Sequence, residues 1–401
     1  CACLVGSEMC IRDRLTIITR IDILINMIKI NLDLRNACST SGIGNFKRNL
    51  AIHIARFSDI ELRGCYNYTR HLNKKNYDWF EGKLNQSFVL DKLVYNNKNF
   101  HLPIYYENMF SSNANFNLFL TYSLPSVKFK NPVISTIHDL IVLKTRCESK
   151  QFIKAHERDL NFTVRNSSLI LTVSESSKTD ICNYFNLSKE KVKIVHNGIE
   201  IQQFSREYSQ EEIFNIQKKY NLPSKFILSF GGYRKHKNIE RLLLAYSQLP
   251  YSIRKELKLV ITNQNSDLIQ FAKKCDIRKD VTFTPFIDEK DKVILYKMSL
   301  MVYYASLYEG FGVPIIEAQA CHIPVITSNI SSMPEAAGNS AIFVNPYEIK
   351  EIEEAIITLF HDQLLRERLI HNGYSNALKY TWEKSAKELH DILHNEWINT
   401  N

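Results

Sequence analysis

The sequence predicts an α/β protein made of two doubly wound domains, each a parallel sheet covered by helices. Short apolar, β-branched runs alternate along the chain with segments of helical periodicity, which is the pattern of such sheets. The length of 401 residues exceeds one ordinary core and fits two domains of roughly 150–200 residues each. No uninterrupted apolar run of about 18 residues occurs, so the sequence predicts no transmembrane helix.

In the first half, the runs Lys29–Leu34, Val133–Thr136 and Leu169–Val173 predict strands. Ile43–Phe57 predicts the helix that follows the first of them. The region Asn67–Phe116 is rich in Asn, Lys and aromatic residues and shows little periodicity, so we expect loops and mobile elements there.

In the second half the alternation is cleaner. The expected strands are Phe226–Phe230, Leu257–Ile261, Val281–Phe283, Leu300–Tyr304, Val325–Thr327 and Ala341–Val344, with helices such as Ile239–Gln248 and Lys350–Phe360 between them. The junction of the two domains is expected near Asn197–Ser205, after a strand at Val192–Val195. Ligands of such sheets bind at the carboxyl ends of the strands, so the loops there are the candidates for chemistry.

The net charge of +9 comes from 51 Lys and Arg against 42 Asp and Glu, spread along the chain. A solvated surface accounts for this excess, and so does attraction to anions such as nucleotides, phospholipid headgroups or diphosphate-linked lipids. Nucleic acid is not an expected partner, because the chain has no zinc-finger spacing, basic zipper or aromatic RNA-binding signature.

The first 26 residues are expected to be foreign to the protein. The run Leu4–Arg14, LVGSEMCIRDR, is the translation of DNA that resembles a transposon-type sequencing adapter. We therefore expect Met27 to open the native protein, and Leu15–Asn26 to be upstream sequence. The alternatives are a native N-terminus or a secretory signal, and the charges in Leu15–Ile30 argue against a signal.

Cysteine spacing predicts neither a zinc site nor a disulfide framework. Three of the nine cysteines lie in the first 26 residues, and the other six are widely and irregularly spaced with no CxxC. A reducing cytoplasm is the expected compartment.

Two glycine-containing loops follow predicted strands. Gly42-Ile-Gly44 opens a helix after the first strand, where backbone N–H groups and the helix dipole favour an anion, although a plain tight turn explains it equally well. Gly231-Gly232-Tyr-Arg234-Lys-His-Lys237-Asn238 offers close backbone approach and a basic cluster for a diphosphate. A solvated basic loop with Asn238 as a helix cap is the alternative.

The most informative segment surrounds a third loop, Glu309-Gly-Phe-Gly312-Val-Pro314, which precedes a helix that carries Glu317. Proline suits the first turn of a helix, so the loop lies at a positive helix end. Carboxylates there can accept hydrogen bonds from sugar or ribose hydroxyls. Complementation of the dipole by Glu317 in the first turn is the alternative.

The run Ser306–Pro346 resembles the C-terminal signature of glycosyltransferase family 4, the retaining group 1 enzymes with a GT-B fold. The motifs that carry the resemblance are Glu309-x7-Glu317, Cys321-His-Ile-Pro324, Ser331-Ser-Met-Pro334-Glu335 and Asn345-Pro346, and upstream Gly42-Ile-Gly44, Ile137-His138-Asp139-Leu140, Ser174–Lys178, Asn197-Gly198-Ile199 and Gly231–Asn238. The resemblance spans Met27 to about Trp382 and is strongest to bacterial mannosyl- and rhamnosyltransferases of polysaccharide assembly.

The resemblance implies a role for each matching residue. Glu309 contacts hydroxyls of the donor sugar, and His138 reaches the donor near the reacting carbon; both are the expected catalytic residues. Glu317 binds the ribose of the nucleotide. The donor diphosphate is expected to be bound by Arg234, Lys237, Gly42, Gly44 and Gly312. The chain departs from the family at His322, where glycine is frequent, and at Gly232, where arginine is frequent.

The expected activity is transfer of a hexose, for which mannose from GDP-mannose fits best, to a glycan or lipid-linked acceptor with retention at the anomeric carbon. The family resemblance implies same-face attack assisted by the departing phosphate. No Asp-x-Asp occurs in the chain, so no metal or other cofactor is expected, and the basic residues carry the diphosphate charge. The alternatives are a nucleotide-sugar epimerase of the same fold and a non-catalytic nucleotide-sugar-binding scaffold.

The resemblance also implies an organisation and a location. An acceptor-side Rossmann-like domain is expected at 27–197, a nucleotide-sugar domain across a cleft at 198–378, and a C-terminal helix at 379–401 that packs back on the first domain. We expect a bacterial, cytoplasmic enzyme of polysaccharide or lipopolysaccharide synthesis. The first half of the chain is basic. Its lysines and arginines could contact a membrane surface, through Lys47, Arg48, Lys74 and Lys75, or could form a solvated face.

Overall fold

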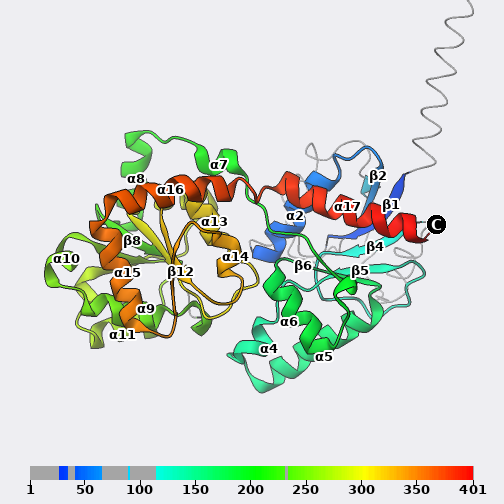
Figure 1. Cartoon of the computed structure of the whole chain (residues 1–401), viewed down its shortest axis with the longest axis horizontal. Coiled ribbons are helices and arrows are strands. Elements are labelled where there is room, and N and C mark those ends of the chain that lie inside the picture. The colour runs from blue at the N-terminus through cyan, green and yellow to red at the C-terminus, as the bar shows by residue number, and fades with distance from the viewer. Residues whose placement is uncertain (1–26, 35–40, 66–88, 91–113, 231–233, 401) are drawn as a thin grey trace, which may run out of the picture. The chain divides into compact units, whose positions relative to one another are not determined.

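The structure of the chain is a computed structural model, which describes residues 27–34, 41–65, 89–90, 114–230 and 234–400 (Figure 1). Among these residues there are two sheets, one of seven strands and one of six. The strand pairs with a defined register, such as β1 with β4 and β8 with β11, are parallel. The predicted α/β class with two parallel sheets is therefore confirmed. The predicted adapter segment, residues 1–26, lies outside the described residues.

The seven-stranded sheet has the order β3-β2-β1-β4-β5-β6-β7. Its strands are β1 (Ile28–Asp33), β2 (Ile60–Cys65), β3 (Val89–Leu90), β4 (Phe116–Phe119), β5 (Val133–Thr136), β6 (Leu169–Thr172) and β7 (Val192–Ile194). Every residue of β4, β5 and β6 is buried. Burial on both faces is what a parallel sheet covered by helices requires.

Three strands of this sheet escape the sequence pattern. β2 has the mixed sequence IELRGC, β3 is a two-residue strand within the region 67–116 where loops and mobile elements were expected, and β4, with the sequence FNLF, begins at the last residue of that region. In β4, Asn117 is fully buried, and its Oδ1 accepts a 2.9 Å hydrogen bond from Nδ2 of Asn31 on β1. Nδ2 of Asn117 donates in turn to the carbonyl oxygen of Asn131 at 3.3 Å, and these hydrogen bonds let asparagine stand inside a sheet that propensity assigns to apolar residues.

Two of the helices that accompany this sheet begin at a serine that caps them. The helices are α2 (Gly42–Ile54), α4 (Ile141–Thr145), α5 (Lys150–Asn166) and α6 (Glu175–Phe185). The hydroxyl of Ser174 accepts the N–H of Ser177 at 3.0 Å and so caps α6. Ser41 caps α2 in the same way. Both caps satisfy a backbone donor that a helix start leaves free.

The six-stranded sheet has the order β10-β9-β8-β11-β12-β13. Its strands are β8 (Phe226–Ser229), β9 (Lys258–Ile261), β10 (Val281–Phe283), β11 (Met301–Tyr304), β12 (Val325–Ser328) and β13 (Ile342–Val344). All six were predicted, with ends that differ by one residue at most. Each lies between segments of strong helical periodicity, which is why the pattern alone suffices here.

The helices that surround this second sheet are α7 (Ile201–Ser205), α8 (Gln210–Tyr220), α9 (Ile239–Gln248), α10 (Tyr251–Glu256), α11 (Ser266–Lys274), α12 (Glu289–Met298), α13 (Val313–Ala320), α14 (Met333–Ala337), α15 (Ile349–His361) and α16 (Gln363–Ala377). Figure 1 draws α8 and α16 above the strands and α9 and α11 below them. A buried cluster joins α9, α11 and α15 to the sheet through residues such as Leu243, Leu259 and Ile356.

The chain divides into two compact units. The first comprises Cys1–Thr136, Phe162–Leu171 and Ala386–Asn401, and the second comprises Ile137–Asn161 and Thr172–Ser385. The last helix, α17 (Trp382–Thr400), ends in the first unit, where the ring of His390 stacks on Phe57 and its Nε2 lies 2.9 Å from Oδ2 of Asp59. The domain boundaries expected from the sequence stay a prediction.

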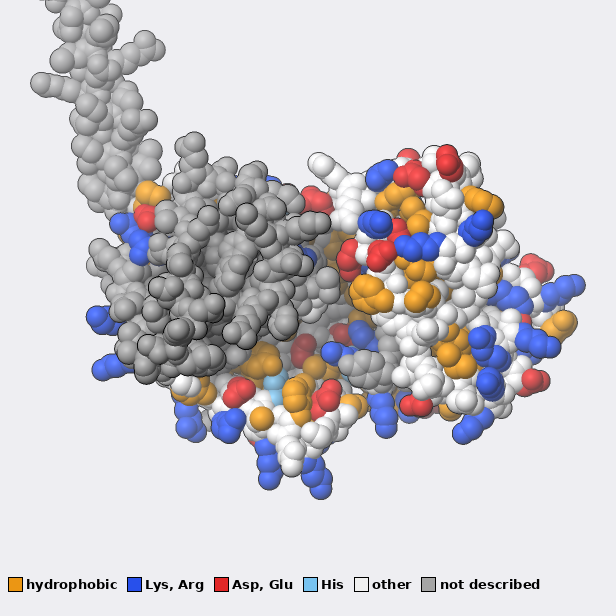
Figure 2. Space-filling view, turned by 180° about the vertical axis from the view of Figure 1, so that it is seen from behind, with side chains coloured by type: hydrophobic (Ala, Val, Ile, Leu, Met, Phe, Trp, Pro, Cys, Tyr) orange, Lys and Arg blue, Asp and Glu red, His pale blue; other side chains and the backbone are white. Residues whose placement is uncertain are grey.

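None of the described helices is both long and apolar enough to cross a membrane. On the face shown in Figure 2, basic and acidic side chains are interspersed over the second unit. Charges of both signs are thus mixed on this surface, as they are along the sequence.

Candidate functional site

A loop at the carboxyl end of β11 carries the first candidate carboxylate, Glu309. The following helix, α13, has Gly312 as its N-cap and a proline in its first turn, as predicted. Gly312 has a φ of 110°, a conformation that favours glycine. The Ser332 hydroxyl donates to the carbonyl oxygens of Glu309 and Phe311 at 2.9 and 2.8 Å. These bonds fix the loop at the positive end of the helix.

Glu309 forms an ion pair with Lys237, which comes from the loop after the neighbouring strand β8. The Nζ of Lys237 lies 2.8 Å from Oε1 of Glu309 and donates to the hydroxyl of Tyr304 at 2.7 Å. Burial, the largest single effect, raises the pKa of Glu309, but the charges of Lys237 and His236 together with hydrogen bonds from Lys237 and Ser306 outweigh it, and the pKa is lowered. The structure therefore brings together two residues that the sequence predicted separately.

The loop after β8 is held in place by its own polar groups. The N–H of Leu307 donates to the carbonyl oxygen of His236 at 2.7 Å, and Nδ2 of Asn238 donates to that of Pro346 at 2.7 Å. Burial lowers the pKa of His236 to about 4, so this ring is neutral near pH 7. Arg234 begins the short 3₁₀ turn Lys235–Lys237 and is exposed. Gly231, Gly232 and Tyr233 lie outside the described residues.

Glu317, the second candidate carboxylate, is buried in α13 and held by two residues of α12. Lys292 Nζ donates to its Oε1 and the Tyr296 hydroxyl to its Oε2, both at 2.7 Å. The prediction that Glu317 lies in the first turn was wrong, because the helix begins at Val313 and Glu317 is its fifth residue. Simple dipole complementation is therefore not its role. Sequence reasoning missed both partners, which no motif marks.

His138 and Asp139 follow β5, and their loop lies against Gly310. A Cβ atom built on Gly310 would be 2.8 Å from Oδ2 of Asp139 and 3.2 Å from the carbonyl oxygen of His138. The His138 segment and the Glu309 segment thus meet, although the sequence separates them by about 170 positions. Asp139 was not among the predicted site residues, and only its place beside His138 marks it.

The start of α6 contacts the same loop from another direction. The hydroxyls of Ser174 and Ser177 both donate to the carbonyl oxygen of Gly310, at 2.7 and 3.1 Å. The carboxylate of Glu335 accepts the backbone N–H of Glu175 at 2.9 Å, and lies 3.2 Å from Nε2 of His196. A carboxylate at a helix N-terminus is favoured by the helix dipole. Glu335 and the serines thus fix α6 against the loop.

Gly42 and Gly44, the remaining predicted glycines, lie in the first turn of α2. A Cβ on Gly42 would meet no atom within 4 Å, so packing does not require glycine there. Gly44 is buried, and its N–H donates to the hydroxyl of Ser41 at 3.2 Å. Their expected role toward a diphosphate stays a prediction.

Lys47 is not available for the membrane contact considered from the sequence. Its side chain is 2% exposed, and its Nζ lies 3.3 Å from Oδ2 of the fully buried Asp33. A lysine buried in an ion pair between a helix and the sheet presents no charge to a lipid surface. Lys74 and Lys75 lie outside the described residues, and Arg48 is half-buried on α2.

The departure from the family at His322 has a local consequence. His322 has a φ of 61°, in the left-handed region that favours glycine, and its ring stacks on Tyr374 with centroids 4.4 Å apart. At a position where the resemblance favours glycine, this chain thus has a histidine whose ring is packed on Tyr374.

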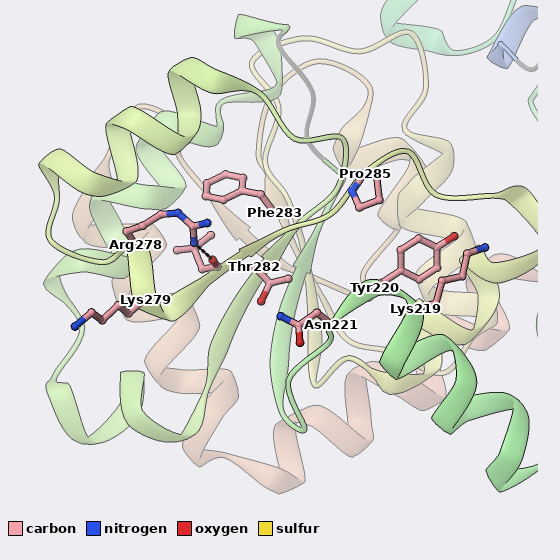
Figure 3. Close-up of a pocket in the computed structure, with 9 residues that line it drawn as sticks. Lys219, Tyr220, Asn221, Arg278, Lys279, Thr282, Phe283 and Pro285 are labelled. Atoms are coloured by element: carbon pink, nitrogen blue, oxygen red, sulfur yellow. Dashed lines mark hydrogen bonds between the residues drawn. The ribbon is translucent and has the colours of Figure 1, made fainter.

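A separate pocket of about 350 Å³ lies along the edge strand β10 (Figure 3). It is lined by Lys219, Tyr220, Asn221, Arg278, Lys279, Val281, Thr282, Phe283 and Pro285. Arg278 donates to the carbonyl oxygen of Val281 at 3.0 Å and covers part of the strand edge. None of these residues is a predicted site residue.

The described residues contain no cluster of three His, Cys, Asp or Glu side chains that would suit a metal ion. The expectation that no metal is needed stays a prediction.

Comparison with known proteins identifies the family. Residues 210–376 match the model for glycosyl transferases group 1, and residues 113–203 match that for glycosyltransferase family 4. Together the matches cover more than half of the chain. The chain belongs to the group 1 glycosyltransferases. The predicted resemblance is thereby confirmed, and it places Lys237, Glu309 and Glu317 inside the matched C-terminal region.

Among curated relatives of this group 1 glycosyltransferase are two Escherichia coli proteins. The serotype-specific mannosyltransferase WbdA is 26% identical over 66% of this chain and 34% of its own length. The O-antigen chain mannosyltransferase B is 27% identical over 64% of this chain and 68% of its own length. The match thus spans about a third of WbdA.

Solved structures agree with the fold. The Anabaena protein HepE in complex with UDP-glucose superposes with a TM-score of 0.70 at 16% identity, covering 92% of this chain and all of HepE. WaaG, a glycosyltransferase involved in lipopolysaccharide biosynthesis, gives a TM-score of 0.64 at 14% identity, over 91% of this chain and 99% of WaaG. The GT-B fold predicted from the sequence is confirmed.

Proposed function

We propose that the chain transfers a hexose from a nucleotide diphosphate sugar to a hydroxyl of a glycan or lipid-linked acceptor in cell-surface polysaccharide synthesis. The observation that carries the proposal is the ion pair between Lys237 and Glu309, which come from the carboxyl ends of adjacent strands beside the N-terminus of α13. A cation, a carboxylate and a helix N-terminus suit a diphosphate joined to a sugar. Membership of the group 1 glycosyltransferases supports this reading.

Mannose from GDP-mannose is the proposed donor. Support comes from relatives whose names include serotype-specific mannosyltransferase and O-antigen chain mannosyltransferase. The same names support an acceptor that is a growing polysaccharide.

Each site residue has a proposed role. Glu309 accepts hydrogen bonds from donor-sugar hydroxyls, and Glu317 from the ribose. Lys237, Arg234 and the backbone at Gly312 neutralise the diphosphate. Gly42 and Gly44 contribute backbone N–H groups to it, and His138 contacts the sugar near its anomeric carbon.

The proposed reaction retains the anomeric configuration. The bond from the anomeric carbon to the β-phosphate oxygen breaks, and the acceptor oxygen bonds to the same face of that carbon. The acceptor proton passes to the departing phosphate oxygen, so no separate base is needed. Lys237, Arg234 and the start of α13 stabilise the charge that develops on this phosphate. No metal takes part in the proposal, because these groups supply the positive charge.

Acceptor-dependent nucleotide release tests the proposal. The protein is incubated with GDP-mannose and with UDP-glucose, with and without a polysaccharide acceptor fraction. Nucleotide release only in the presence of acceptor supports transfer. Acceptor-free isomerisation of the sugar would instead indicate an epimerase, and binding without turnover a scaffold. Glu309→Ala is expected to abolish release.

We further propose that the enzyme acts in the cytoplasm, with peripheral contact at the inner face of the plasma membrane when its acceptor is lipid-linked. Co-sedimentation with vesicles that contain about a third anionic lipid tests this contact, and it should weaken as salt is raised.

A further inference from the structure

Tyr304 is a buried tyrosine whose hydroxyl lies beside the ion pair of Lys237 and Glu309. It is the last residue of β11 and is 4% exposed. Its hydroxyl accepts a hydrogen bond from Nζ of Lys237 at 2.7 Å, and its ring centroid lies 4.7 Å from the same nitrogen. One side chain thus gives the ammonium group both a hydrogen bond and a cation–π contact. The proposed mechanism does not use this tyrosine.

The sheet holds Tyr304 in a fixed place. β11 is an interior strand, with β8 on one side and β12 on the other. Tyr304 is paired in register with Thr327 of β12, whose hydroxyl donates to the carbonyl oxygen of Tyr304 at 2.8 Å. A buried ring on an interior strand has little freedom to move, because its neighbours are close-packed. The hydroxyl is therefore positioned by the sheet and not by a loop.

Lys237 has no such rigidity of its own. It ends the short 3₁₀ turn Lys235–Lys237, and a lysine side chain is a long, flexible stem. Its ammonium group donates to Tyr304 and to Glu309. In the proposed reaction Glu309 turns to the hydroxyls of the donor sugar. The hydrogen bond with Tyr304 is then the contact that Lys237 can keep while it binds the diphosphate.

The hydroxyl of Tyr304 keeps its proton over the ordinary working range of pH. Burial raises the pKa of Tyr304 well above its usual value, and the charge of Glu309 and a hydrogen bond to Glu309 raise it further. A neutral hydroxyl accepts a hydrogen bond from Lys237 without cancelling the charge of the ammonium group. The full positive charge of Lys237 thus stays available for a phosphate.

We propose that Tyr304 is a positioning residue, which holds the ammonium group of Lys237 at the place where the phosphate of the donor departs. The inference rests on the proposed function, which places the diphosphate at Lys237. The hydrogen bond exists in the empty site and can persist in the complex, so its loss should change donor affinity little. Charge on the departing phosphate oxygen grows only in the transition state, where its stabilisation depends on the placement of the cation. Loss of the hydroxyl should therefore lower kcat more than affinity.

Tyr304→Phe tests this split, because it removes the hydroxyl and keeps the ring and its cation–π contact. The full chain is assayed with GDP-mannose and with UDP-glucose in the presence of a polysaccharide acceptor fraction, and donor binding is measured by calorimetry. We expect kcat to fall about tenfold, as for a misplaced catalytic group. The dissociation constant of the donor should stay within about threefold of the wild-type value.

A double-mutant cycle with Lys237→Met tests whether Tyr304 acts through Lys237. Once the ammonium group is gone, the hydroxyl has nothing to position. Adding Tyr304→Phe to Lys237→Met should therefore change kcat by less than about twofold. A merely structural role of the hydroxyl would lower kcat by the same factor in both backgrounds.

Tyr246→Phe is the matched control. Tyr246 is a fully buried tyrosine of α9, and its hydroxyl donates to the carbonyl oxygen of Leu257 at 2.8 Å. The variant should lower the temperature of thermal unfolding, because a buried carbonyl loses its donor. Its kcat should stay within about twofold of the wild type, since neither residue is part of the candidate site.

The outcomes separate the positioning role from the proposed function. An unchanged kcat in Tyr304→Phe, or an equal loss in the Lys237→Met background, overturns the role of Tyr304 and leaves the proposed function standing. A donor dissociation constant that rises as much as kcat falls also overturns it, since Tyr304 would then act in binding. If the wild-type protein neither binds nor turns over either nucleotide sugar, the proposed function is contradicted and the role of Tyr304 falls with it.

Discussion

The ammonium group of Lys237 lies 2.8 Å from a carboxylate oxygen of Glu309, and the two side chains are only 20% and 13% exposed. In the proposed reaction both must exchange this contact for contacts with the donor. Lys237→Met removes the cation, and kcat/KM should fall by about a hundredfold, or about 3 kcal/mol, as expected for loss of one preorganised charge contact. Steady-state kinetics with the identified donor measures this.

The matched control for that change is Lys235→Met, in the same 3₁₀ turn but exposed. Its kcat/KM should stay within about twofold of the wild type, because exposed charges contribute little. Equal losses in both variants would mean that only the general basic character of the loop matters.

Replacing Glu317 tests its contact with Lys292 and Tyr296. Glu317→Ala leaves a largely buried ammonium group without its carboxylate, and the free energy of unfolding should fall by about 3 kcal/mol. Lys292→Met combined with Glu317→Leu removes both charges and should be more stable than Glu317→Ala alone. Urea unfolding of the wild type, of Glu317→Ala and of the double variant measures the three free energies. If Glu317→Ala were as stable as the wild type, this structural role of Glu317 would be refuted.

Two glycines of the family motifs should respond differently to alanine. A Cβ on Gly198 would lie 2.5 Å from the backbone nitrogen of Trp382, and that backbone has no flexible end that can move aside. Gly198→Ala should therefore destabilise the protein by about 1–3 kcal/mol. Gly42→Ala meets no atom and should change stability by less than about 0.5 kcal/mol. Thermal unfolding compares the two, and the reverse order would contradict the packing at Gly198.

Removal of divalent metal should leave transfer unchanged, because Lys237, Arg234 and the start of α13 are proposed to carry the diphosphate charge. Dialysis against EDTA followed by a rate measurement tests this. A rate that falls by more than about tenfold and returns with Mg²⁺ would require a metal site in place of these cations.

The sequence predicted the second sheet closely because each strand is a short apolar run between strongly periodic helices. It missed β4, whose buried Asn117 depends on Asn31 more than eighty positions away. Long-range pairing of this kind leaves no local pattern.

In the candidate site, too, some residues were predicted from the sequence and others were missed. Glu309, Glu317 and Lys237 were found because a family motif carries them. Lys292, Tyr296 and Asp139 were missed because only the folded chain brings them to those carboxylates or to the Glu309 loop. The start of α13 was predicted correctly, and the error over Glu317 is one of position within the helix, since it is the fifth residue and lies just beyond the first turn.

The first compact unit is assembled from three stretches of chain, and its last piece is Ala386–Asn401. The contact of His390 with Asp59 spans 331 residues. During synthesis this unit therefore stays incomplete until α17 has left the ribosome, whereas most of the second unit is made before α17. Closing such a long loop late is slow, so newly made protein should depend on chaperones more than a chain of two consecutive domains would. Shortening α17 would then lower the yield of folded protein before it altered any residue of the site.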